Sequence, residues 1–277
     1  MENLNFKVMM GVIPGYGHEN QELTPSNAYR IGDETWREAV EEVSNMQIDP
    51  ENPESPYYYA VGGKIVPALA VYSKNFGCPV GGEVGIQVES SIGENQDVEL
   101  YKKSVIETIK VAMAKLSQTT TTIEWANEDK SMGTTYIYEG GKKINENNPL
   151  GGIEHFSVSL GDGKNSNEEY VRVGSAIQDA MDIVSSTGTG KADEKYYMIS
   201  GIMTPAQNEN GGIQFSASQN PMYGQTDNEL YRQSIIKTIE QVMRTIGQKS
   251  ASINFKEETV SFDLENILKQ QNEMGEI

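Results

Sequence analysis

Histidine and cysteine, which often act as general bases, nucleophiles or zinc ligands near neutral pH, are rare in this chain of 277 residues. The two histidines are His18 and His155, and the single cysteine is Cys78. Neither histidine has a partner at the spacing of a zinc site, so the sequence predicts no bound metal and no cofactor. The GxSxG elbow of serine hydrolases and the GxxxxGK[ST] phosphate loop are also missing. His18 and His155 are therefore the candidate bases if the protein is an enzyme.

Two glycine-rich loops, at 11–22 and 161–164, are candidates for holding an anionic ligand. Each follows an expected strand and precedes an expected helix, where backbone N–H groups can hold an anion. Cationic and hydrogen-bonding side chains lie in these loops and near them. The candidate ligand-binding residues are Tyr16, His18, Arg30, His155, Lys164 and Arg172. The acidic charge of the chain opposes phosphate binding at these loops.

The charge of the chain is strongly acidic, with 40 Asp and Glu against 22 Lys and Arg and a net charge of −18. Such a charge repels phosphate backbones, so we expect no direct contact with nucleic acid. The acid could serve solubility alone. It would also suit a protein that docks onto a basic protein surface.

The amino terminus and the hydropathy predict a cytoplasmic protein without a membrane partner. The first 15 residues lack the basic region and the cleavage site of a secretory signal. No apolar run approaches the length of a membrane span. One cysteine permits no intramolecular disulfide, which fits a reducing compartment.

One stretch of sequence occurs twice and indicates the organisation of the whole chain. Residues 100–118 (LYKKSVIETIKVAMAKLSQ) and 230–248 (LYRQSIIKTIEQVMRTIGQ) align without a gap and share Leu, Tyr, Ser, Ile, Thr, Ile, Met and Gln. Chance would give about one match over this length. The repeat predicts a duplicated unit that carries an amphipathic helix.

The segments around each repeated helix follow the same order: strand, helix, strand, strand, helix, strand. We expect a first copy at 1–139, a linker at 140–152 and a second copy at 153–277, each with an added edge strand (134–139 and 258–262). A short helix is expected at 263–274. Expected helix starts are Asp33 and Asp97 as N-caps, and the capping boxes Ser175/Gln178 and Thr226/Glu229.

This order is that of the ferredoxin-like, or split βαβ, arrangement. The expected fold class is therefore α+β: a tandem duplication of a ferredoxin-like unit that forms a pseudo-two-fold pair. The helices would cover one face of each sheet, and the other face would be polar. That second face could meet solvent, pack one copy on the other, or form the floor of a binding site.

The leading functional hypothesis is a non-catalytic acidic binding protein. It would capture a small polar ligand, or act as an inhibitor that blocks a macromolecular partner, at a cleft between the two copies. One alternative is an enzyme that uses His18 or His155 as base. Another is a mimic of nucleic acid that occupies a basic protein surface. A homo-oligomer is compatible with each hypothesis.

Overall fold

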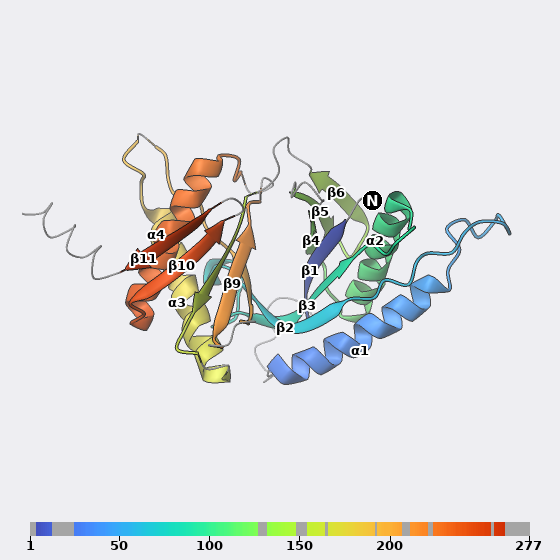
Figure 1. The fold of residues 1–277 in the computed structure, drawn as a ribbon, viewed down its shortest axis with the longest axis horizontal. Coiled ribbons are helices and arrows are strands. Elements are labelled where there is room, and N and C mark those ends of the chain that lie inside the picture. The colour runs from blue at the N-terminus through green and yellow to red at the C-terminus, as the bar shows by residue number, and fades with distance from the viewer. Residues whose placement is uncertain are drawn as a thin grey trace, which may run out of the picture. The chain divides into compact units, whose positions relative to one another are not determined.

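The computed structural model describes residues 4–12, 25–126, 132–147, 154–163, 166–191, 193–206, 211–220, 224–255 and 258–263. This part of the chain is an α+β protein with four α-helices and a large antiparallel sheet of 11 strands (Figure 1). The chain forms two compact units, Met1–Ala68 with Val84–Ile153, and Leu69–Glu83 with Glu154–Ile277. The segment 69–83 therefore belongs with the second half of the sequence. None of the helices described is long and apolar enough to cross a membrane.

In the first unit, the order along the chain is β1 (Asn5–Gly11), α1 (Pro25–Ser44), β2 (Lys64–Val71), β3 (Glu83–Ser91), α2 (Val98–Lys115), β4 (Thr121–Ala126), β5 (Met132–Tyr138) and β6 (Lys143–Asn147). The strands lie in the order β2-β3-β1-β4-β5-β6. Phe6 is buried on β1, where its ring centroid lies 6.3 Å from Trp36 on α1 and 6.4 Å from Tyr101 on α2. The core of this unit therefore lies between the sheet and the two helices.

In the second unit, the order is β7 (His155–Leu160), α3 (Asn167–Ser186), β8 (Gly201–Pro205), β9 (Ile213–Ser218), α4 (Asn228–Ile246), β10 (Ser250–Phe255) and β11 (Thr259–Asp263). The strands lie in the order β11-β10-β7-β9-β8, and β8 also pairs with the last residues of β2, which belong to this unit, with Leu69 opposite Met203. Phe156 and Phe215 stack edge to face in the core, 5.5 Å apart. Helices α3 and α4 pack against each other.

The repeated stretch forms helices in both units, as its periodicity predicted. Asp97 and Asp227 are the N-caps, and their carboxylates accept from the backbone N–H of Leu100 at 2.8 Å and of Leu230 at 2.9 Å. The expected cap Asp97 is thus confirmed. The capping box expected to begin at Thr226 is wrong by one residue, because the observed N-cap is Asp227.

The starts of the other two helices differ more from the expectation. Helix α1 begins at Pro25, so Asp33 lies inside the helix, where it pairs with Arg37 at 2.9 Å. Proline suits the first position of a helix because its φ is already helical and its missing N–H would have no partner there. Helix α3 begins after Ser166, whose side chain accepts from Glu169 N, and not at Ser175. In both helices buried side chains already lie in the first turn, Ala28 in α1 and Tyr170 in α3.

The sheet contains one strand more than the sequence predicted. Strand β6 lies inside the stretch 140–152 that we expected to be a linker, and it pairs with β5. Its residues 143–146 are all exposed, so no apolar alternation marks it as a strand. The expected helix at 263–274 lies outside the described residues, apart from Asp263 at the end of β11.

Shared residues of the repeat make the same hydrogen bonds in the two units. Ser104 Oγ accepts from Tyr59 N at 2.9 Å, and Ser234 Oγ accepts from Tyr197 N at 2.8 Å. The hydroxyl oxygen of Tyr59 accepts from Asp97 N at 3.1 Å. The Tyr197 hydroxyl does the same for Asp227 N at 3.2 Å. These bonds join the start of each repeated helix to the segment that leads into β2 in the first unit and into β8 in the second.

Candidate ligand-binding site

Three of the six expected site residues, Tyr16, His18 and Lys164, lie outside the described residues. Arg30 is exposed on α1, and its guanidinium lies 3.5 Å from the Glu34 carboxylate one turn later. Exposed pairs of this kind contribute little stability, because water and salt screen them. This position is compatible with a ligand contact but does not point to one.

Arg172, on α3, is held by groups of its own unit. Its Nε and NH2 donate to the two carboxylate oxygens of Glu169, at 2.8 and 2.6 Å, and its NH1 donates to the Ile246 carbonyl at 3.0 Å. The Glu169 hydrogen bond is the main cause that raises the pKa of Arg172. The arginine thereby ties the first turns of α3 to the last residue of α4. This contact gives Arg172 a structural role, and a role in ligand binding stays a prediction.

His155 begins β7, and its Nδ1 lies 3.0 Å from Ser218 Oγ. The two residues lie directly opposite each other on β7 and β9. A histidine within hydrogen-bond reach of a serine is what an activated nucleophile requires. Cross-strand pairing explains the same contact without catalysis. Since Arg30, Arg172 and His155 lie on different elements and have different partners, these contacts do not gather them into one site.

The second face of the sheet pairs some of its own polar groups. Lys7 and Glu124 lie opposite each other on β1 and β4, and their charged groups are 3.0 Å apart. Ser252 and Ser261, on β10 and β11, have hydroxyl oxygens 3.0 Å apart. At these positions the polar groups satisfy one another, so the face does not need a ligand to account for them.

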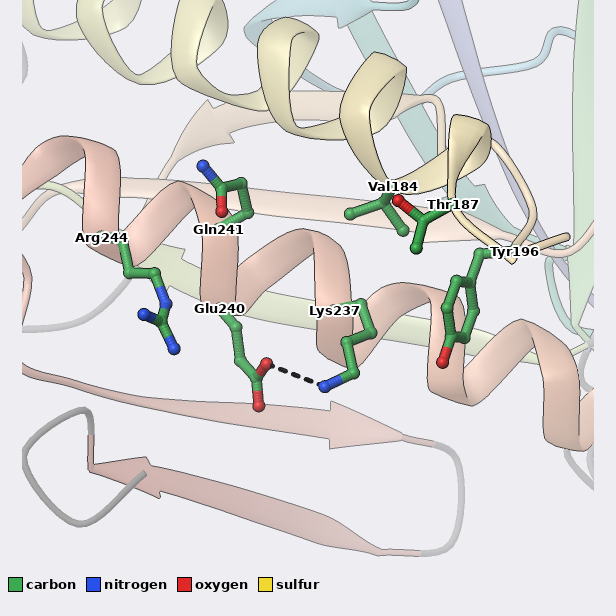
Figure 2. A pocket seen from close by; sticks show the side chains of 7 residues that line it. All are labelled: Val184, Thr187, Tyr196, Lys237, Glu240, Gln241 and Arg244. Carbon is green, nitrogen blue, oxygen red and sulfur yellow. Dashed lines mark hydrogen bonds and ion pairs between the residues drawn. The ribbon is translucent and has the colours of Figure 1, made fainter. Parts of the chain in front are cut away.

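A pocket of about 330 Å³ lies between α3 and α4 in the second unit (Figure 2). Its lining consists of Val184, Thr187, Tyr196, Lys237, Glu240, Gln241 and Arg244. Its volume falls at the lower end of the roughly 300–1,000 Å³ of small-molecule pockets. None of the six residues expected from the sequence belongs to its lining.

Helix α4 positions one wall of the pocket. Lys237, Glu240, Gln241 and Arg244 follow the spacing i, i+3, i+4 and i+7, which places them along one face of the helix. Figure 2 shows their side chains extending from α4, with Tyr196 beyond the Lys237 end of this row. The opposite face of α4 carries buried Ile235, Ile239 and Val242, so core packing fixes the orientation of the wall.

The end of α3 and the chain after it form the opposite wall. Val184 is buried and supplies an apolar surface. Thr187 is the C-cap of α3, and its Oγ1 donates to the Ile183 carbonyl at 3.0 Å. The chain then returns, and Tyr196 N donates to the Thr187 carbonyl at 3.3 Å. This bond places Tyr196 beside the helix end.

The charges of the α4 wall alternate in sign. Lys237 Nζ lies 3.3 Å from a Glu240 carboxylate oxygen, and Arg244 follows one turn later. The Glu240 side chain is only 14% exposed, whereas that of Lys237 is 46% exposed. The pocket thus carries two cations and one carboxylate in a chain whose net charge is −18.

The first unit does not repeat this chemistry. In the ungapped alignment, Lys237 corresponds to Glu107, Glu240 to Lys110, Gln241 to Val111 and Arg244 to Ala114. The ion pair is reversed, with Lys110 and Glu107 2.8 Å apart, and the second cation is absent from the aligned position. Residues that hold the helix in place are shared between the copies, whereas residues that line the pocket differ. That difference was a usable signal in the sequence.

Within the residues that the structure describes, no group of three or more His, Cys, Asp or Glu could hold a metal ion. Cys78 is buried, and its burial raises the pKa of the thiol. A buried cysteine with a raised pKa is a poor nucleophile. Comparisons with protein-family models, with curated proteins and with solved structures found no match to this chain.

Proposed function

We propose that this protein is a non-catalytic binding protein that holds a small polar ligand with an acid group in the pocket between α3 and α4. The supporting observation is the concentration of Lys237 and Arg244 at a pocket of about 330 Å³ in an otherwise acidic chain. A cation beside a partly apolar wall forms stronger hydrogen bonds to a carboxylate than a fully solvated cation does. The lining includes no histidine or cysteine, and Glu240 is already paired with Lys237.

The finer fold hypothesis forms part of this proposal. We infer that the two units descend from one ferredoxin-like unit by duplication. The repeated element order, the strand orders β4-β1-β3-β2 and β10-β7-β9-β8, and the matching bonds of Ser104 and Ser234 support it. After duplication, one copy could keep the structural residues and gain a pocket. The expected cleft between the copies stays a prediction.

Titration calorimetry with small carboxylic acids tests the binding proposal. Arg244→Ala, which installs the residue of the first copy, should weaken binding of an acid such as glutarate about tenfold or more, because a charge-assisted hydrogen bond is lost. Lys103→Gln is the matched control, since this exposed lysine aligns with Gln233 of the second copy. Equal affinities of the wild-type protein and the Arg244→Ala variant would exclude the pocket as the site.

Capture of a basic protein is the second candidate function, and exposed acidic and apolar groups favour it. Glu41, Asp49, Glu51 and Glu54 are all exposed at the end of α1 and in the loop that follows. Phe76 and Val80 are each 66% exposed in the second unit. Binding of a purified basic protein should weaken strongly between about 50 and about 300 mM NaCl. A partner held equally well at both concentrations would contradict capture by charge, including nucleic-acid mimicry.

An enzyme remains the third candidate, and the contact between His155 and Ser218 supports it. If His155 or His18 acts as base, alanine at both positions should abolish any activity detected in the wild-type protein. An activity that survives both substitutions would remove this candidate.

A further inference from the structure

This inference rests on the proposed function, in which the pocket binds a ligand with an acid group. The order of charges along the pocket wall indicates which other charged groups that ligand carries. Along α4 the order is Lys237, Glu240, Arg244, which is positive, negative, positive. These residues are spaced by about one helical turn, so the Cβ atoms of neighbouring members lie about 5–6 Å apart on one face of the helix. A ligand that lies along this wall meets all three.

Glu240, the negatively charged residue of the row, is less exposed than its partner Lys237. One carboxylate oxygen of Glu240, Oε2, pairs with Lys237 Nζ at 3.3 Å, and the side chain is 14% exposed. A carboxylate has room for about four hydrogen bonds, so one lysine does not exhaust its capacity. An anionic group of a ligand placed beside Glu240 would be repelled, whereas an ammonium group would be attracted.

The end of α3 adds negative character to the same pocket. Thr187 and Val184 line it at the carboxyl end of α3, where the helix dipole is negative. The last turn of α3 contains no basic residue to offset that charge. By contrast, α4 has Arg244 in its own last turn. The opposite wall therefore also favours a cationic group on the ligand.

We propose that the ligand is a small amino acid with a second acid group, that is, an ammonium group carried between two carboxylates. The two carboxylates pair with Lys237 and Arg244, and the ammonium pairs with Glu240. Val184 and the ring of Tyr196 contact the methylene groups between them. This charge order is complementary to the wall, and the ligand's net charge of about −1 offsets the wall's net excess of one cation.

Three probes that differ by one charged group test this inference: L-glutamate, glutarate without the ammonium, and 4-aminobutanoate without one carboxylate. Calorimetry on the wild-type protein should show glutamate binding about tenfold or more tighter than either analogue. Glutarate that binds as tightly as glutamate would overturn the amino-acid inference and leave the acid-binding function standing. If none of the three probes binds, the inference and the proposed function both fail.

Glu240→Gln provides a second test with opposite effects on two probes. Removing the carboxylate charge should weaken glutamate about tenfold and strengthen glutarate, because attraction is lost in one case and repulsion in the other. A merely structural role of Glu240 would change the affinities of both probes in the same direction. Lys103→Gln again serves as the control, and its affinities should match those of the wild-type protein. A same-direction change in Glu240→Gln overturns the proposed contact.

Discussion

Two carboxyl groups of the second unit show how local surroundings set the behaviour of single residues. Hydrogen bonding from Arg172 is the main cause that lowers the pKa of Glu169, and the N–H of Asp162 adds to it. Burial has the opposite effect on Glu83, because it raises the pKa of that carboxyl. The Tyr72 hydroxyl, 2.9 Å from Glu83 Oε2, offsets part of this rise. The charge of Glu169 therefore stabilises the fold, whereas the charge of Glu83 is unfavourable but tolerated.

Glu169→Gln should lower the free energy of unfolding at neutral pH by about 1–3 kcal/mol, because Arg172 and Asp162 N lose a charged acceptor. Because the pKa of Glu169 is lowered in the folded protein, its ionised carboxylate stabilises the fold at pH values above the ordinary pKa of glutamate. This stabilisation is lost as the pH falls through the lowered pKa. The difference in the free energy of unfolding between the wild-type protein and the variant should therefore shrink as the pH is lowered from about 7 to about 3. Denaturant unfolding over this pH range measures it.

Glu83→Gln is the matched control with the opposite sign. A raised folded-state pKa means that stability is lost as pH rises through it, so neutralising Glu83 should stabilise the protein at pH 7 and have less effect at low pH. Glutamine can still accept the Tyr72 hydrogen bond. If the stabilities of Glu169→Gln and Glu83→Gln changed with pH in the same way, the opposite pKa shifts assigned to the two carboxyl groups would be wrong.

At the scale of elements, the segment between β2 and β3 is anchored on α3 by a buried glutamine. Gln178 Oε1 accepts from Gly81 N at 3.0 Å, and its Nε2 donates to the Tyr72 and Pro79 carbonyls at 3.3 and 2.8 Å. Next to Tyr72, the Ser73 hydroxyl donates to the Asp182 carboxylate at 2.6 Å. These bonds explain why residues 69–83 belong to the second unit. They satisfy backbone groups that a loop normally leaves to water.

Gly174 lets this segment approach α3 closely. A Cβ at this position would lie 1.9 Å from the Gly81 carbonyl oxygen, so Gly174→Ala must displace the segment. The expected loss is about 1–3 kcal/mol of stability, as for other overpacked sites. Hydrogen exchange should show faster exchange in residues 72–82 and unchanged exchange in α1.

Ser175→Ala, at the next position of α3, is the control and should leave exchange in residues 72–82 as it is in the wild-type protein. A Gly174→Ala variant with normal protection of that segment would contradict the close approach.

At the scale of the whole molecule, the net charge of −18 is the dominant property. Many of the cations are already used in short-range pairs, such as Lys115 with Glu38 and Glu42 at 3.3 and 3.4 Å. The remaining excess of acid repels itself in the folded state more than in the expanded chain.

Salt should therefore stabilise the protein. Between about 10 and about 200 mM NaCl, screening shortens the range of repulsion from about 30 Å to less than 10 Å, so the Tm should rise by several degrees. Calorimetric scans at fixed pH measure it. A Tm that falls with added salt would mean that the paired charges matter more than the excess acid.

The sequence by itself determined the repeated helices, the apolar faces of the strands and the acidic character. Asp97 shows why: where a cap directly precedes a 3.6-residue apolar period, both signals are local and agree with each other. Where the local signal was weak, the expectation was wrong. Strand β6 is exposed and follows no period, and α1 and α3 begin well before the caps expected at Asp33 and Ser175.

Only the tertiary structure decided where the candidate site lies. The pocket joins Val184 and Thr187 at the end of α3 to Tyr196 and to a stripe on α4, elements that pack together through the core. Arg172, a predicted ligand contact, binds Glu169, three residues away, and the distant Ile246 carbonyl, and the sequence indicates neither bond. Packing of elements far apart in the chain decides which charged side chains line a pocket, and a linear pattern does not contain that information.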